Sequence, residues 1–158
     1  MPNKAIQDSY ADHDSHCYGC GRLNEHGMQI KSHWNGTESI CIYTPEAYRS
    51  SLPGYAYGGL IASLIDCHGI GTAMAANQEA KGPTSTSQPP KRYITASLHV
   101  DFLRPTPIGP LELHGRIKEL RGRKAVVTVE LFAAEQLCAR GEVIGVQIPD
   151  GYMREPQS

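Results

Sequence analysis

Two glycines and one acidic residue that could do chemistry lie in the stretch GYAYGGLIASLID, residues 54–66. Gly58 and Gly59 open an apolar segment that is predicted to be a helix. The start of a helix leaves backbone N–H groups unpaired and carries a partial positive charge, and glycine adds no Cβ to block a ligand. Such donors can hold the oxyanion that forms when a carbonyl is attacked. The alternative is that the glycines only make a tight turn into a packed helix.

Asp66 lies two turns into the same apolar helix, where aspartate is a poor helix former. Burying a carboxylate is costly unless it is paired or solvated in a cavity, and burial raises its pKa, which suits a general base. A structural aspartate that accepts hydrogen bonds from a neighbouring strand or subunit would give the same pattern. The sequence leaves both interpretations open.

The spacing of these residues constrains how they could act together. Gly58 and Asp66 are eight residues apart, roughly 12 Å along a helix that rises 1.5 Å per residue. Catalytic contacts need about 3 Å, so one carbonyl cannot touch both residues of one helix. Either one residue is irrelevant, or two chains pair about a twofold axis so that Gly58 of one faces Asp66 of the other. The second case predicts an obligate homodimer.

The elements around these residues predict an α+β fold. The segment 58–77 contains no proline and is apolar nearly all round in its first turns, which indicates a buried helix. Gly69 and Gly71 inside it suggest close approach by a neighbouring element. Strands are expected at 28–34 and 39–44, joined by Asn35-Gly36, and at 93–103, 110–120, 124–134 and 137–148. The last three should form an antiparallel meander, and the whole sheet should curve around the helix.

The first of these four later strands alternates in polarity. Its pattern places Ile94 and Leu98 on one face with Phe102, and Thr95 on the more polar face with His99 and Asp101.

Length and composition limit the number of domains, the partners and the location of the protein. The 158 residues suit one domain, with 1–16 as a flexible or loosely docked arm, 17–150 as the domain and 151–158 as a C-terminal tail. The net charge of -1 argues against nucleic acid as a partner. The strongly apolar run 60–65 is far shorter than the ~20 residues of a membrane span. A polar N-terminus and five scattered cysteines favour a reducing, cytoplasmic location.

Cysteines and histidines near the N-terminus allow a metal site to be considered. Cys17 and Cys20 have the spacing of two zinc ligands, and His13, His16 or His26 could complete the set. No second Cys-x-x-Cys follows, so the favoured interpretation is that both cysteines pack as small residues in a Gly-rich turn. We read His68 as a core or interface histidine with satisfied hydrogen bonds.

Three motifs resemble the hotdog-fold acyl-CoA thioesterases, notably their phenylacetyl-CoA-thioesterase-like branch. YGGLIASLID (57–66) is similar to the His-Gly-Gly…Asp signature of that family, and ITASLHVDFLRP (94–105) to its third-strand motif. CYGCGRLNEHG (17–27) is similar to its Cys-x-x-Cys-Gly-x-x-Asn-x-x-Gly turn. The resemblance runs from about residue 17 to 148, with the order of strands and helix agreeing. It implies hydrolysis of an acyl-CoA thioester, no metal or redox cofactor, and a homodimer or a dimer of dimers.

The resemblance also implies roles for individual residues. The backbone N–H of Gly58 would polarise the thioester carbonyl, Asp66 would activate water or attack the carbonyl, and Thr95 would position the water. Substrate-binding positions are Tyr57, Gly59, Ser51 and Arg104, the last as a partner for CoA phosphates or as an ordinary solvated charge.

Two positions depart from the family pattern. Tyr57 replaces the signature histidine, and Ser51 lies where relatives often carry Asn or Gln. A non-catalytic acyl-CoA-binding hotdog module is therefore the alternative function. A hotdog dehydratase or hydratase ranks last, because no His-plus-carboxylate pair is evident where that chemistry would need it.

Overall fold

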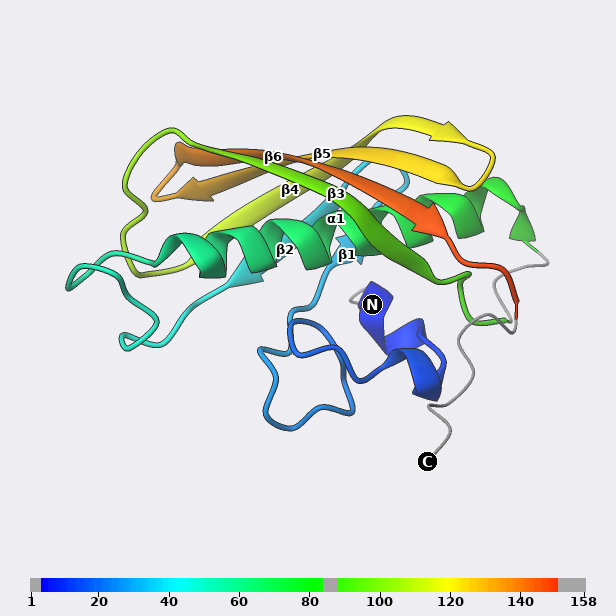
Figure 1. The fold of residues 1–158 in the computed structure, drawn as a ribbon, viewed down its shortest axis with the longest axis horizontal. Helices are drawn as coiled ribbons and strands as arrows, with labels where there is room; N and C mark the ends of the chain where they lie inside the picture. Colours follow the sequence, from blue (N-terminus) through cyan, green and yellow to red (C-terminus); the bar gives the residue numbers. More distant parts are fainter. Residues whose placement is uncertain (1–3, 84–87, 151–158) are drawn as a thin grey trace.

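The computed structural model describes residues 4–83 and 88–150, which form a six-stranded antiparallel sheet curved around one long helix (Figure 1). The strand order is β1-β2-β4-β5-β6-β3. This is the α+β hotdog architecture that the sequence predicts, so the expected fold class is confirmed.

Helix α1 (Gly58–Ala80) is the central core element. Its length and composition would let it cross a membrane, but 72% of its most apolar window is buried inside the protein, as expected of a core helix. The predicted close approach at its glycines is confirmed. A Cβ on Gly69 would lie 2.6 Å from Val143 Cγ2 on the sheet, and one on Gly71 would lie 3.1 Å from Gln7 Nε2.

The four later strands match their predicted positions to within about one residue. They are β3 (Tyr93–Phe102), β4 (Leu111–Arg121), β5 (Lys124–Ala133) and β6 (Gln136–Gln147). Strands β4, β5 and β6 form the predicted meander, and β3 pairs with β6 at one end of the sheet. Within residues 4–83 and 88–150, no strand pairs with the other long edge of β3.

The first hairpin is shorter than predicted. Strands β1 (His33–Trp34) and β2 (Ser39–Tyr43) flank a turn in which Asn35 Oδ1 accepts hydrogen bonds from the backbone N–H groups of Thr37 and Glu38. Residues 28–32, expected in the first strand, instead form backbone hydrogen bonds with the N-terminal segments. The N–H groups of Met28 and Ile30 donate to the carbonyls of Tyr18 and Gly19, and the Ser32 carbonyl accepts from the N–H of Ile6.

The described part of the N-terminal arm, which was expected to be flexible or loosely docked, packs against the rest of the domain. Residues 4–16 contain two 3-10 helices, η1 (Ile6–Ser9) and η2 (Asp12–Asp14), which lie beneath α1 (Figure 1). Ile6, Gln7 and Tyr10 are buried, and they pack near Gly71, where the missing Cβ makes room for them. The expected tail 151–158 lies outside the described residues.

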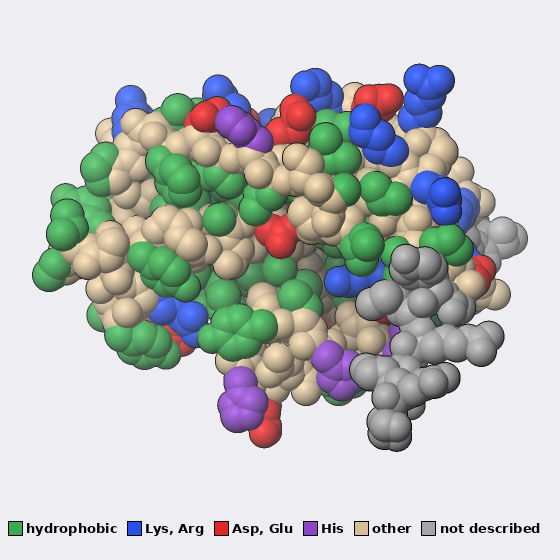
Figure 2. Space-filling view, viewed as in Figure 1, with side chains coloured by type: hydrophobic (Ala, Val, Ile, Leu, Met, Phe, Trp, Pro, Cys, Tyr) green, Lys and Arg blue, Asp and Glu red, His purple; other side chains and the backbone are tan. Residues whose placement is uncertain are grey.

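Apolar side chains remain on the surface near the start of α1. In the view of Figure 2 they gather at the end of the molecule where α1 begins, whereas Lys and Arg lie mainly along the outer border of the sheet. The large exposed apolar residues of this region are Leu52, Tyr55, Tyr57, Phe102 and Leu103. On strand β3, Leu98 is 39% exposed on the side that faces α1, whereas Ile94, 41% exposed, points to the outer face of the sheet. An exposed apolar patch of this kind marks a surface that a ligand or a partner covers.

Candidate active site

Asp66 lies on the side of α1 that faces the start of β3. The Thr95 hydroxyl donates a hydrogen bond of 2.5 Å to Asp66 Oδ1. Among the described residues, nothing else is hydrogen-bonded to this carboxylate. It borders a cavity of about 190 Å³ together with Arg92, Cys17 and Cys67. The carboxylate is thus half-buried beside open space, with one oxygen held and the other available.

Burial raises the pKa of the Asp66 carboxyl above its ordinary value. The hydrogen bond from Thr95 and the charge of Arg92 act in the opposite direction, because both stabilise the ionised form. A carboxylate whose charge is destabilised by its surroundings but retained by one hydrogen bond is suited to accept a proton.

A β-bulge places Thr95 against Asp66, which corrects the prediction that Thr95 lies on the polar face with His99 and Asp101. In the β3–β6 register Thr95 pairs with Gly145 and Ser97 with Ile144, so Ala96 is the extra residue. The extra residue reverses the alternation of side chains. Thr95 therefore shares the helix-facing side with Leu98 and Phe102, and Ile94, expected there, points the other way.

Gly58 and Gly59 begin α1, and Tyr57 is its N-cap residue with no side-chain hydrogen bond to the helix. No group in the described part of the chain accepts a hydrogen bond from the N–H of Gly58 or Gly59. These donors, with the positive end of the helix dipole, are available to an external oxygen. The Gly58 backbone borders a second cavity, of about 240 Å³, with Phe102, Leu103 and Arg104.

The remaining predicted substrate-binding residues divide between this cavity and the surface. The Tyr57 ring lies against Gly59, where a Cβ would be 2.8 Å from Tyr57 Cε2. Arg104 lines the Gly58 cavity. Ser51 does not line either cavity. It lies in an exposed turn, where its backbone N–H donates to the Tyr55 carbonyl at 3.0 Å.

Within one chain, Gly58 and Asp66 lie on one unbroken helix and border different cavities. Their separation of eight residues corresponds to about 12 Å. A single chain therefore places the free N–H donors of Gly58 and Gly59 apart from the Asp66 carboxylate, as the sequence predicts.

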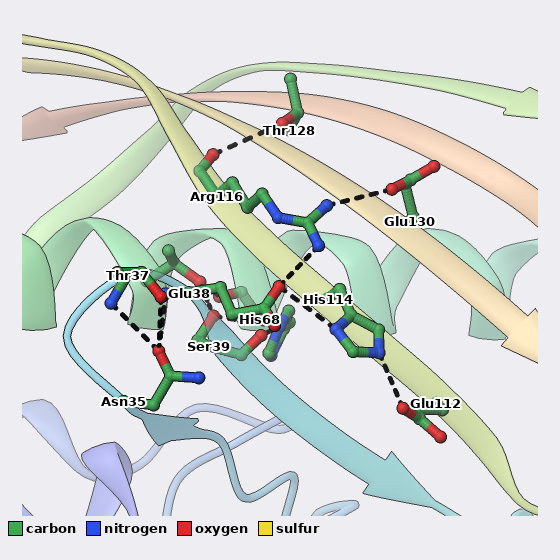
Figure 3. Close-up of polar contacts among 11 residues, drawn as sticks. Asn35, Thr37, Glu38, Ser39, His68, Glu112, His114, Arg116, Thr128 and Glu130 are labelled. Atoms are coloured by element: carbon green, nitrogen blue, oxygen red, sulfur yellow. Dashed lines mark hydrogen bonds and ion pairs between the residues drawn. The ribbon is translucent and has the colours of Figure 1, made fainter.

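His68 and its neighbours form a structural network rather than a reactive site. The imidazole is fully buried, with Nδ1 2.8 Å from Ser32 Oγ and Nε2 3.1 Å from Ser39 Oγ (Figure 3). Burial lowers the pKa of His68 to about 4. The interpretation of His68 as a core histidine with satisfied hydrogen bonds is confirmed.

Two groups of histidines and carboxylates involve strands of the sheet. On the outer face of the sheet, Glu38 lies between Arg116 and His114, and His114 also contacts Glu112 (Figure 3). His99 and Asp101 contact each other at 3.1 Å and are both exposed. Neither group borders the cavity beside Asp66.

The sequence interpretation missed the place of Cys67. This residue follows Asp66 on α1, and its sulfur lies with those of Cys17 and Cys20 in one group, all within 4.8 Å of one another. The histidines at 13, 16 and 26 do not belong to this group. The available signal was a cysteine directly after a candidate catalytic residue, in a sequence that holds further cysteines at 17 and 20.

The chain is similar in sequence to esterases and thioesterases. The family model described as "Thioesterase superfamily" matches residues 53–139. A proposed esterase of Pseudomonas aeruginosa is 36% identical over 87 residues, which cover 54% of this chain and 58% of that protein. The acyl-coenzyme A thioesterase THEM4 of Rattus norvegicus is 23% identical over 70% of this chain and 43% of its own length. The chain thus spans about half the length of these relatives.

Solved structures agree with the family match. A thioesterase superfamily protein from Shewanella loihica is 43% identical, with a TM-score of 0.68 over 90% of this chain and 99% of that protein. The PaaI protein of the E. coli phenylacetic acid degradation operon has a TM-score of 0.63 over 77% of this chain and 81% of its own, but is 15% identical and so shows the fold alone. The family match covers more than half of the 158 residues, and the chain therefore belongs to the thioesterase superfamily.

Proposed function

We propose that this protein hydrolyses acyl-CoA thioesters at two equivalent sites, each formed by two copies of the chain. The observation that carries the proposal is the half-buried Asp66 carboxylate, held by Thr95 beside a cavity. The second requirement, a set of free oxyanion donors, is met by the start of α1 at Gly58. The similarity to acyl-coenzyme A thioesterases supports CoA as the thiol part of the substrate.

The course of β3 supports an arrangement in which two chains complete each site. One end of β3 lies at the level of Asp66, where Thr95 binds the carboxylate. The other end lies at the level of Gly58, where a Cβ would be 3.4 Å from Phe102 Cζ. Antiparallel pairing of β3 with its copy would reverse these ends. Asp66 of one chain would then face the partner's Gly58.

The open edge of β3 is suited to this pairing. An unpaired strand edge presents a row of N–H and C=O groups that another strand can satisfy. The exposed Leu98 on the helix-facing side would be covered by the partner in the same step. The apolar surface that a single chain exposes would thus be covered by a second copy of the chain.

In the proposed reaction Asp66 acts as a general base. It takes a proton from water as the water oxygen bonds to the thioester carbon, and the carbonyl oxygen, now negative, is held by the N–H of the partner's Gly58. Collapse of this intermediate breaks the C–S bond, and the proton passes to the CoA sulfur. This reaction requires no metal or redox cofactor.

The substrate contacts follow from the cavity beside Gly58. Phe102 and Leu103 line that cavity and give the acyl group an apolar wall, and the Tyr57 ring lies beside Gly59. Arg104 on the rim of that cavity provides a cation for the phosphates of CoA. A cytoplasmic location would supply this substrate and keep the five thiols reduced.

The test is a panel of CoA esters with short, medium-length and arylacetyl acyl groups, with free thiol release as the readout. The wild type should turn over at least one ester. Asp66→Asn, which keeps the shape and can still bind Thr95, should lower kcat by about 100- to 10,000-fold. Asp12→Asn, at an exposed carboxylate, is the matched control.

An Asp66→Asn variant with the wild-type rate would remove Asp66 from the mechanism. Saturable binding of CoA esters without hydrolysis of any of them would instead favour the non-catalytic binding module, to which the Tyr57 departure points.

A further inference from the structure

Three cysteines from two distant segments meet beside the candidate active site. Cys17 and Cys20 lie on the N-terminal turn, and Cys67 lies on α1. Their sulfur atoms are all within 4.8 Å of one another, and the Cys17 and Cys67 sulfurs are 3.9 Å apart. All three are free thiols. The proposed hydrolysis does not use them, so the group needs a separate explanation.

The turn that carries Cys17 and Cys20 is built to hold its shape. The Gly21 N–H donates to the Cys17 carbonyl at 2.8 Å, and the Gln29 side chain donates to the Gly21 carbonyl at 2.9 Å. A Cβ on Gly21 would collide with the backbone of Cys17, and one on Gly19 would collide with the sulfur of Cys67. Glycine at both positions therefore lets the turn bring its two thiols against α1.

The sulfur spacing suits a shared metal ion. A tetrahedral zinc ion with Zn–S bonds of about 2.3 Å holds its sulfur ligands roughly 3.8 Å apart. The Cys17–Cys67 separation of 3.9 Å is close to that value. A disulfide would require the two sulfurs to approach to about 2.05 Å. Thiolates are soft ligands, which select zinc over magnesium or calcium.

We propose that Cys17, Cys20 and Cys67 bind one soft divalent cation of the zinc class through three thiolates. The same three sulfurs border the cavity of about 190 Å³ beside Asp66, so a water molecule from that cavity would fill the fourth position. The site ties the N-terminal turn to α1. It is independent of the proposed hydrolysis, in which the carbonyl is held by Gly58.

A positive charge lies beside the three thiols. The guanidinium of Arg92 borders the same cavity as the three cysteines. Three thiolates carry one more negative charge than a divalent cation neutralises, and Arg92 offsets it.

The direct test is metal analysis of the full chain purified without chelator, followed by titration of the chelator-treated protein with cobalt(II). We expect one zinc per chain, and we expect cobalt(II) to give the visible bands of a tetrahedral site with thiolate-to-cobalt charge transfer in the ultraviolet. The proposal would be overturned if neither bound zinc nor the cobalt(II) bands were found. It would also be overturned if mass spectrometry showed a Cys17–Cys67 disulfide in protein kept in reducing buffer.

Variants locate the site. Cys17→Ala and Cys67→Ala should abolish the charge-transfer band, while Cys138→Ala, which removes a buried cysteine elsewhere, should keep it. Full cobalt binding by either cluster variant would refute the assignment. Because a cluster variant could fail to fold, the wild type is also tested alone. Chelator should lower its thermal midpoint, and zinc should restore it.

Discussion

At the scale of single residues, the Thr95 hydroxyl decides how the Asp66 carboxylate is presented. It binds Oδ1 at 2.5 Å, and the other oxygen is left to face the cavity. A hydrogen bond to a charged group contributes about 1.5–3 kcal/mol. Loss of it would leave the carboxylate free to rotate and would raise its pKa further, because this bond, together with the charge of Arg92, opposes the effect of burial.

Thr95→Val keeps the shape of the side chain and removes the hydroxyl. We expect kcat for a good CoA ester to fall about 10- to 100-fold, in line with the strength of one charged hydrogen bond, with little change in thermal stability. Thr95→Ser, which retains the hydroxyl, should keep most of the rate. Equal rates for Thr95→Val and wild type would show that Thr95 does not orient the carboxylate.

The residues of the candidate site were predictable only where the local sequence determines the environment of the side chain. Gly58 and Asp66 lie in one continuous helix. Their residue types therefore indicate the chemistry, and their spacing in the sequence gives the distance between them. Thr95 was assigned to the wrong strand face, because a one-residue bulge at Ala96 leaves no mark in the alternation of polarity. Cys67 was missed, because its meeting with Cys17 depends on a contact across 50 residues.

At the scale of elements, the helix and the four later strands were predictable from the sequence. Each shows either a strong periodicity of apolar residues or one unbroken apolar run. The first strand was predicted too long. Residues 28–32 are apolar and extended in pattern, but their hydrogen-bond partners are the N-terminal segments. The packed state of residues 4–16 was also not predicted. It depends on the absence of a side chain at Gly71, which makes room for Tyr10.

The open edge of β3 is the element on which assembly should depend. Leu98 is 39% exposed in the single chain, on the side that faces α1. Leu98→Asp would place a charge in the apolar contact between two β3 strands, and burying that charge is costly. We expect a monomer that has lost thioester hydrolysis.

Light scattering gives the mass of the assembly, against 17.3 kDa for one chain. Ile42→Asp, an exposed apolar position on β2 that is 67% exposed, is the control and should leave both mass and rate unchanged. A Leu98→Asp protein that remains a fully active dimer would argue against pairing through β3.

At the scale of the whole molecule, one chain contains both halves of the proposed site but holds them about 12 Å apart. The fold alone cannot bring them together, because both are fixed on the same rigid helix. If two chains pair about a twofold axis, Gly58 of each chain can lie near Asp66 of the other, and both sites are completed. The central claim is therefore that Gly58 and Asp66 act in different chains.

Two variants allow this claim to be tested. Gly58→Pro removes the backbone N–H and adds a ring. Proline is tolerated at the first helical position, and Tyr57, with φ -76° and ψ 152°, has the extended backbone that a following proline requires. Gly58→Ala keeps the N–H and controls for the added side chain. Asp66→Asn disables the other half. Each of Gly58→Pro and Asp66→Asn alone should be a nearly inactive dimer.

The most direct measurement is the thioesterase rate of a mixed dimer, purified through two different tags, with Gly58→Pro in one chain and Asp66→Asn in the other. If each site takes its donor from one chain and its base from the other, one of the two sites is intact. The mixed dimer should then recover about half the wild-type rate. A mixed dimer as inactive as its parents would contradict the account, since both groups would then have to act within a single chain.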